Sequence, residues 1–522
     1  MTAGNLTDAR EQPMVVHAQA ADLAAEFMET HSHTAEPLTP AAQKALRRKL
    51  LFFILGTTVA VSLMMFIDKS TLSYGVLLGV MEETKIDNRQ YNNLNTLFYA
   101  GYIIGQVPGQ WLIQKTPLRY YVSGSVFLWS ILIFLHCTAT NYGGLIALRF
   151  ILGMVEAPVL PALEVTMSMF FTPTLLHTLQ PIFWISCVAS PIPTGLLGYA
   201  LLFSKSVVTP WKFFMITSGG LTFLLALWCL YIYPSNPMTA RFLSESEKVH
   251  LIHTIQQKTR SSIEQKTFKP HQAREALTDP ASWLFALAAF CLMLSNNLAF
   301  QQSLLYLQIG VSNLGSTLVW VASGGFASAV ALVASFLLRS FPGYSALWAS
   351  LWCVPAIAGG IGMVALPWDR TIPLLACLLL ACNTWGMTYI ISFGWATSSC
   401  AGYTKKTTRG AMFMAAYGIS NIISPQLWNA GGAPRYYGTW AAQIVVSWVG
   451  TPVCLLGVRW VLVRRNRERI AWIREREAAG VSAVSAFLTK GGGGADDGAR
   501  KEVDVAMLDL TDLENRQFIY PL

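Results

Sequence analysis

Twelve runs of apolar residues, each about 20 residues long, restrict what this chain can fold into. A helix of ~20 apolar residues crosses the ~30 Å hydrocarbon core of a bilayer. The first six runs cover about 50–72, 92–113, 119–139, 143–169, 179–203 and 211–233. The last six cover about 282–307, 313–338, 344–366, 371–396, 411–430 and 439–463. We therefore predict an all-α integral membrane protein with twelve transmembrane helices in two six-helix halves.

The composition excludes a soluble protein of this length. Charged residues make up 12% of the 522 residues, whereas soluble domains contain about 25%. The net charge of +9 does not indicate nucleic acid, because the basic residues lie between the apolar runs, as they do in oriented membrane proteins. We expect the lipid bilayer as the surroundings of the chain and no nucleic acid as its partner.

The runs divide the chain into five parts. We predict a disordered cytosolic tail at 1–43, an N-terminal half at 44–233, a cytosolic central loop at 234–281, a C-terminal half at 282–463 and a cytosolic tail at 464–522. Lysine and arginine are concentrated in the tails, the central loop and the other segments on the same side, so both termini are expected in the cytosol. Ser244 to Glu247 predicts the start of a short amphipathic helix, and Gly491 to Gly494 has a linker composition.

Prolines inside two of the runs are expected to break or bend their helices. They are Pro158 and Pro161 in the fourth run and Pro181, Pro191 and Pro193 in the fifth. Such breaks are tolerated in membranes when neighbouring groups satisfy the freed backbone atoms. Hinges and plain packing bends are both compatible with this pattern.

No residue pattern of an enzyme or a metalloprotein occurs in the chain. The nine cysteines lie in or beside apolar runs, without the CxxC or Cys/His spacing of a metal site. The sequence GxxxxGK[ST] is absent, which argues against ATP-driven transport. We expect no enzymatic activity, no bound metal and no cofactor.

Short motifs follow one another in a fixed order along the chain. They are FIDKSTLSY at 66–74, FYAGYIIGQVP at 98–108, ALRFILGMVEA at 147–157, GYTKKTT at 402–408, GISNIISPQ at 418–426, APRY at 433–436 and DLTDLEN at 509–515. Together they resemble the fungal allantoate permease family, the anion:cation symporter branch of the major facilitator superfamily. The resemblance covers about 45–522.

The resemblance implies a major facilitator-type bundle with its solute site near the midplane, between the halves. It implies proton-coupled uptake of a small organic anion such as allantoate, ureidosuccinate, nicotinate or pantothenate. The implied protein is a monomer in the plasma membrane, and its partners are the organic anion and H+.

Departures from the family pattern leave other functions open. The segment 172–179 lacks the usual basic residues, and Cys187-Val188 stands where the family has Asn-Gly. Metabolite efflux is one alternative, and a nutrient sensor that moves no solute is another. The sensor is disfavoured because the C-terminal tail has only about 60 residues.

Buried charge marks the first set of candidate site residues, because charged side chains in membranes tend to face a cavity or one another. The candidates are Asp68 and Lys69 in the first run and Arg149 and Glu156 in the fourth. Arg149 is suited to a substrate carboxylate, and a carboxylate such as Glu156 is suited to the coupling proton. A structural network, for example an Asp68–Arg149 pair, is the alternative, and Lys69 is expected to snorkel to the outer interface.

Polar side chains mark the second set, in the C-terminal half. The candidates are Asn297, Gln301, Asn383, Trp385, Tyr417 and Asn421. Such groups can hydrogen-bond a neutral part of a solute, and the aromatic rings can stack on it. Hydrogen bonding between helices is the competing interpretation.

The sequence predicts that Arg149→Lys weakens the binding of an anionic solute at normal surface abundance. Loss of a bidentate contact costs on the order of 1.5–3 kcal/mol, or roughly tenfold to a hundredfold in affinity. The measurement is solute affinity normalised to surface protein. Unchanged affinity with less folded protein would instead assign Arg149 to helix packing.

Overall fold

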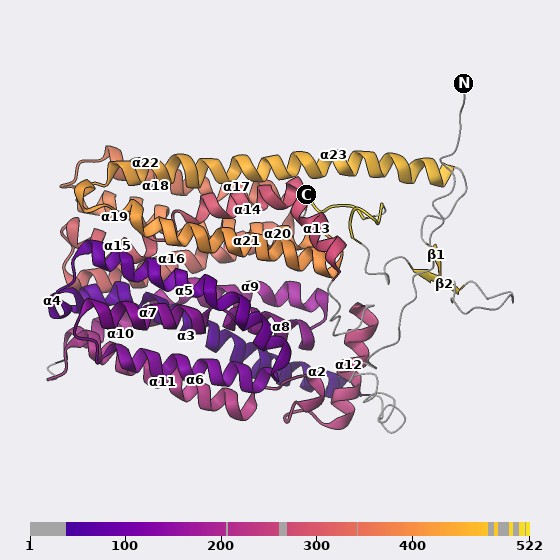
Figure 1. Ribbon diagram of the computed structural model, residues 1–522, viewed down its shortest axis with the longest axis horizontal. Coiled ribbons are helices and arrows are strands. Elements are labelled where there is room, and N and C mark those ends of the chain that lie inside the picture. The colour runs from indigo at the N-terminus through magenta and orange to yellow at the C-terminus, as the bar shows by residue number, and fades with distance from the viewer. Residues whose placement is uncertain are drawn as a thin grey trace.

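The computed structural model describes residues 38–204, 207–259, 269–341, 343–478, 485–488, 501–504, 511–516 and 518–522 (Figure 1). The predicted disorder of residues 1–37 and the predicted linker at Gly491 to Gly494 lie outside these ranges. Residues 40–43, assigned from the sequence to the tail, belong to the first helix.

The N-terminal half begins with a continuous helix at Pro40–Leu77, in which a π-helical turn joins two α-helices. Its elements are α2 Pro40–Leu50, η1 Leu51–Leu55, α3 Gly56–Leu77, α4 Val80–Thr84, α5 Asn88–Lys115, α6 Leu118–His136, α7 Tyr142–Glu156, α8 Val159–Phe170, α9 Pro173–Ala189, α10 Pro191–Leu202 and α11 Pro210–Ile232. The fourth and fifth runs are each split in two, at Ala157–Pro158 and at Ser190, as their prolines predict.

The central segment holds η2 Pro237–Thr239, α12 Glu245–Thr259 and α13 Pro270–Thr278. Ser244 and Glu247 form the capping box that starts α12, since each side chain accepts a hydrogen bond from the other residue's backbone N–H. The sequence correctly placed a helix start at this point.

The C-terminal half repeats the pattern of long and broken helices. Its elements are α14 Pro280–Met293, α15 Leu298–Gln308, α16 Asn313–Ser340, α17 Ser345–Leu351, α18 Cys353–Ala365, α19 Thr371–Asn383, α20 Gly386–Ser398, α21 Tyr403–Ile423, η3 Ser424–Leu427, η4 Ala430–Gly432, α22 Tyr437–Ala442, η5 Gln443–Val449 and α23 Gly450–Ala478. Two short strands, β1 Ser485–Leu488 and β2 Lys501–Asp504, pair antiparallel beyond the last helix.

Ten helical segments of the described chain are long and apolar enough to cross a membrane. The remaining two of the twelve predicted runs correspond to α5 and α21, which have spanning length but more polar residues. Both helices lie where the halves meet and pack against each other. Polar side chains are tolerated there because they face protein and not lipid.

The two halves lie side by side along the bundle (Figure 1). The indigo and purple helices form one side, and the orange and yellow helices form the other. One end of the bundle, which we call the terminal end, carries α2, α12, α13 and the C-terminus. The opposite end carries α4 and α22.

Hydrogen bonds join the two halves near the opposite end. Gln301 donates to the Asn92 side chain at 2.6 Å, and Asn92 donates to the Trp428 carbonyl at 2.9 Å. Tyr91 donates to the Phe300 carbonyl at 2.8 Å. The first turns of α5 are therefore fastened to α15 and to the segment after α21.

Glycines allow α5 and α7 to pack with their backbones in contact. A Cβ atom at Gly153 on α7 would collide with the Phe98 carbonyl on α5, and one at Gly101 would collide with the Phe150 carbonyl. Small residues at such crossings are the usual basis of close helix packing in membranes. This contact fixes the position of Glu156, three residues beyond Gly153.

We predict that Gly153→Ala destabilises the protein, because the added methyl group has no space. Overpacking of this kind costs about 1–3 kcal/mol. The measurement is the Tm of detergent-purified protein. Gly124→Ala on α6 is the matched control, because its Cβ would meet no atom within 4 Å. Equal Tm values for the two variants would contradict the packing argument.

Candidate functional site

The sequence suggested that Lys69 snorkels to the outer interface. In the structure it lies deep inside the N-terminal half instead. Its side chain is buried, with the ammonium 5.1 Å from the centre of the Phe66 ring and 5.3 Å from that of Tyr102. The reason is that α3 continues to Leu77, eight residues or about 12 Å beyond Lys69. The expected helix end at residue 72 was too early.

Glu156 is the last residue of α7, and the helix breaks directly after it at Ala157–Pro158. The side chain is completely buried, and neither carboxylate oxygen has a hydrogen-bond partner. The cationic charges that act on it are those of Lys69 and Arg149, and the Asp68 and Glu156 carboxyl groups act on each other as like charges. Neither cation forms an ion pair within 4.0 Å of it in the part of the chain described here.

Asp68 and Arg149 do not form the pair that the sequence suggested. One Asp68 oxygen accepts a hydrogen bond from Thr222 on α11 at 3.1 Å, and the other has no partner. Arg149 donates to Thr71 on α3 at 3.2 Å, and its Nε has no partner. Residue spacing could not predict this, because it does not fix the direction in which each side chain leaves its helix.

Tyrosine rings connect this polar region to the C-terminal half. Tyr99 and Tyr102 on α5 lie 6.1 and 6.2 Å from Tyr417 on α21, measured between ring centres. Asn296 donates to the Tyr99 hydroxyl at 2.9 Å and to the Asn421 side chain at 2.5 Å. Tyr417 and Asn421 therefore face the region of Lys69 and Glu156, across the boundary between the halves.

Sequence reasoning missed Tyr99 and Tyr102 as site residues. Their signal was the pair of tyrosines three positions apart in the motif at 98–108, on one face of a helix. We call the polar and aromatic residues on both sides of the boundary the central cluster. Its members are Asp68, Lys69, Tyr99, Tyr102, Arg149, Glu156, Asn296, Tyr417 and Asn421.

Two helix breaks in the C-terminal half carry unpartnered polar side chains. Asn297 lies where α14 and α15 are interrupted, and neither atom of its amide has a partner. Trp385 lies at the interruption between α19 and α20, and its buried indole N–H is also without a partner. Both residues were predicted as candidates, and each remains available for a hydrogen bond to solute or water.

The other two predicted residues have defined structural partners. Gln301 donates a hydrogen bond to Asn92 and so helps to join the two halves near the opposite end. Asn383 accepts a hydrogen bond from Ser323 at 2.9 Å, and Ser323 is also contacted by Gln302 at 3.5 Å. Hydrogen bonding between helices accounts for both side chains.

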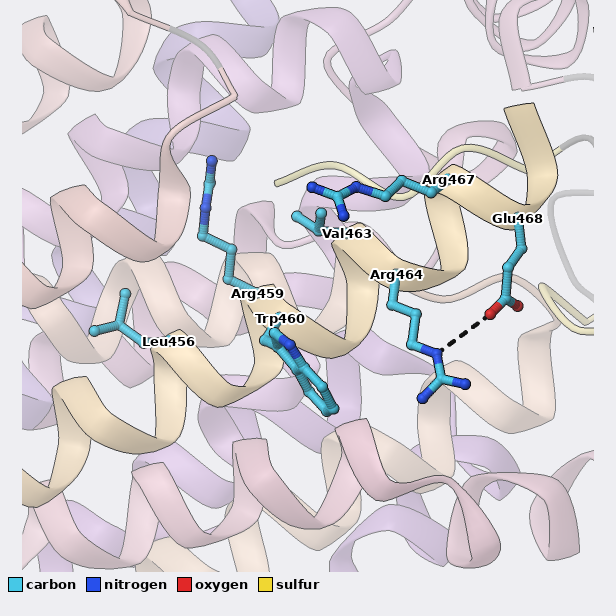
Figure 2. Close-up of a pocket in the computed structure, with 7 residues that line it drawn as sticks. All are labelled: Leu456, Arg459, Trp460, Val463, Arg464, Arg467 and Glu468. Atoms are coloured by element: carbon cyan, nitrogen blue, oxygen red, sulfur yellow. Dashed lines mark hydrogen bonds and ion pairs between the residues drawn. The ribbon is translucent and has the colours of Figure 1, made fainter. Parts of the chain in front are cut away.

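Two surface cavities of the C-terminal half contain no residue of the central cluster. One, of about 460 Å³, lies along α23 and is lined by Leu456, Arg459, Trp460, Val463, Arg464, Arg467 and Glu468 (Figure 2). Arg464 and Glu468 form an exposed ion pair of 3.3 Å there. The other, of about 790 Å³, is mostly apolar and lies among α17, α18, η5 and α23. The central cluster is the better candidate site, because it combines burial with unpartnered charge.

Curated relatives of this chain are transporters of fungi. An uncharacterised transporter of Schizosaccharomyces pombe is 48% identical, covering 93% of this chain and 85% of the relative. The high affinity cysteine transporter of Saccharomyces cerevisiae is 42% identical, covering 98% of this chain and 97% of the relative. The allantoate permease of the same yeast is more distant, at 24% identity over 93% of this chain and 88% of the relative.

The fold agrees with these relatives. The crystal structure of a D-xylose-proton symporter matches 77% of this chain and 97% of that chain, with a TM-score of 0.60 and 11% sequence identity. At that identity the match concerns the fold alone. The family model of the Major Facilitator Superfamily matches residues 46–425. The chain is therefore a multi-pass membrane protein that belongs to the Major Facilitator Superfamily of secondary transporters.

Proposed function

We propose that this transporter carries a small zwitterionic amino acid, cysteine or a close analogue, together with a proton. The observation that carries the proposal is the presence of two buried opposite charges, Lys69 and Glu156, that act on each other without forming an ion pair. Unpaired charges in a membrane interior are costly. A solute that brings both a carboxylate and an ammonium group would satisfy the two together.

The roles of the two residues follow from their charges. Lys69 binds the α-carboxylate of the solute, and Glu156 binds the α-ammonium group. The small side chain of the solute then packs against Tyr99, Tyr102 and Tyr417, whose rings offer apolar faces and hydroxyl groups. The likeness to the yeast cysteine transporter over nearly the whole chain supports a substrate of this size and charge.

A simple organic anion, which the resemblance to allantoate permeases implied, is the second candidate. It is favoured by the presence of two buried cations, Lys69 and Arg149, in the same half. An anion would satisfy these cations but leave the Glu156 carboxylate without a counter-charge. For this reason the zwitterion is the better match, and the allantoate permease is also the more distant relative.

Asp68 is the residue we assign to the coupling proton. It is completely buried, it faces Thr222 through one oxygen, and its other oxygen is free to be protonated. Protonation removes the cost of a buried negative charge, so the group can differ in charge between two states of the transporter.

We propose uptake across the plasma membrane, with the terminal end of the bundle in the cytosol.

The substrate proposal predicts different effects of Glu156→Gln on two solutes. For cysteine the variant should raise KM roughly tenfold to a hundredfold, because one charge-assisted contact of about 1.5–3 kcal/mol is lost. For N-acetylcysteine, which has no ammonium group, Glu156→Gln should leave KM unchanged. Lys69→Gln should impair both solutes. The measurement is radiolabelled uptake in transporter-deficient yeast, normalised to surface protein.

Lys85→Gln and Glu82→Gln are the matched controls, because both side chains are exposed near α4. An equal increase in KM for both solutes in Glu156→Gln would contradict recognition of the ammonium group and favour the anion hypothesis.

Cells that expel cysteine faster when they express the wild-type chain would show efflux instead of uptake.

The coupling proposal predicts that Asp68→Asn abolishes accumulation against a gradient but retains exchange. The amide cannot carry a proton, whereas the solute contacts of Lys69 and Glu156 remain. Uptake by the wild type should rise as the external pH falls and collapse with a protonophore, and counterflow should persist in the variant. The exposed Asp369→Asn is the control. Accumulation by Asp68→Asn that still collapses with a protonophore would place the coupling site elsewhere.

A further inference from the structure

Residues 511–516 and 518–522, which include most of the motif DLTDLEN, are packed against the terminal end of the C-terminal half. We call this segment the clasp. Asp512 and Thr511 are completely buried, and Tyr520 is nearly so. The Thr511 hydroxyl donates to Glu275 on α13 at 2.8 Å, and the Ala401 N–H donates to the Asp512 carboxylate at 3.2 Å.

The site that receives the clasp is a buried network of opposite charges. Lys405 on α21 is completely buried and lies 2.7 Å from Asp512, 2.6 Å from Glu275 and 3.7 Å from Asp279. Asp279 also binds Arg409 at 2.6 Å and Arg465 at 2.8 Å. Burial raises the pKa of Asp279, but the hydrogen bond from Arg465 and the charges of Arg409 and Lys405 outweigh burial and hold this pKa below its ordinary value.

A second set of contacts closes around Tyr520. Its hydroxyl donates to Asp512 at 2.7 Å and accepts from Arg469 on α23 at 2.9 Å. Arg469 also donates to the backbone carbonyls of Asp512 and Phe518, and its guanidinium lies 4.3 Å from the centre of the Tyr520 ring. The Tyr520 N–H donates to the Asn466 side chain at 2.9 Å.

The last two residues extend the clasp across further helices. Trp395 on α20 donates to the Pro521 carbonyl at 2.7 Å, and the Ser345 N–H at the start of α17 donates to the Leu522 carbonyl at 2.9 Å. A single short segment thus bonds to α13, α17, α20, α21 and α23.

Charge balance makes the clasp an integral part of this site. Among the described residues, the carboxylates outside the clasp that pair with Lys405, Arg409 and Arg465 are Glu275 and Asp279. Asp512 supplies a third carboxylate, and the clasp carbonyls take the Arg469 donors. Removing one partner from such a network leaves a buried charge uncompensated, which is strongly unfavourable.

We propose that residues 511–516 and 518–522 bind this cationic site as an intramolecular clasp, which fastens five helices at the terminal end so that the C-terminal half moves as one body. Alternating access depends on each half keeping its internal arrangement while the halves rock against each other. Release of the clasp therefore slows turnover. It leaves solute affinity unchanged, because none of the clasp contacts of the described residues involves the central cluster.

Hydrogen–deuterium exchange of the purified full-length protein tests docking without any need for a solute. The Tyr520 amide should exchange slowly in the wild type, since its N–H is bonded to the Asn466 side chain. Asp512→Asn should speed this exchange at least tenfold. Glu475→Gln, the same chemical change at an exposed site on α23, should leave it unchanged. Fast exchange in the wild type, or equal exchange in both variants, would overturn the clasp.

Uptake kinetics test the consequence for turnover. At equal surface abundance, Asp512→Asn should lower Vmax severalfold and keep KM within about twofold. An unchanged Vmax would overturn the role in turnover. If Asp512→Asn does not reach the membrane, Tyr520→Phe removes only the hydroxyl shared with Asp512 and Arg469. A rate of amide hydrogen–deuterium exchange in Tyr520→Phe between those of the wild type and Asp512→Asn supports the clasp. A rate equal to that of the wild type contradicts it.

Discussion

A backbone amide in the hydrocarbon of a bilayer has no partner except the chain itself, and this constraint governs the whole structure. It forces the apolar runs into helices, and it makes every interruption of a helix significant. The breaks after Glu156, at Asn297 and at Trp385 all lie inside the bundle. They free polar backbone and side-chain groups where protein surrounds them. Two members of the candidate solute site, Glu156 and Asn296, lie at or beside these interruptions.

The two halves contribute different chemistry to that site. The N-terminal half supplies the buried charges of Asp68, Lys69, Arg149 and Glu156. The C-terminal half supplies amides and rings, of which Asn296 and Tyr417 reach the tyrosines of α5. In the proposed binding mode, one half recognises the charged head group of the solute, and its neutral remainder lies against the other half. Rocking of the halves can then change the contacts of the solute without exposing the charges to lipid.

The sequence predicted the number and approximate bounds of the helices, because hydrocarbon thickness fixes their length. It also predicted the helix breaks at Pro158 and Pro191 and the start of α12 at Ser244. It failed for the depth of Lys69, since the polar residues after position 69 concealed two further turns of α3. It failed for the Asp68–Arg149 pair, because direction around a helix depends on packing. The clasp was out of reach, as Asp512 meets Lys405 across more than 100 residues of chain.

The two ends of the bundle are held in different ways, and this difference bears on the transport cycle. Near the opposite end, the halves are joined to each other by uncharged hydrogen bonds such as Gln301 to Asn92. At the terminal end, the charged network of Lys405 and Asp512 lies within the C-terminal half. Uncharged bonds between halves can exchange with water at a small net cost, because water replaces each lost partner. Breaking a buried ion pair costs more free energy, because it leaves a charge without a partner in a nonpolar environment. The proposed rocking motion would therefore open the uncharged bonds between the halves, whereas the ion pairs would hold the C-terminal half together.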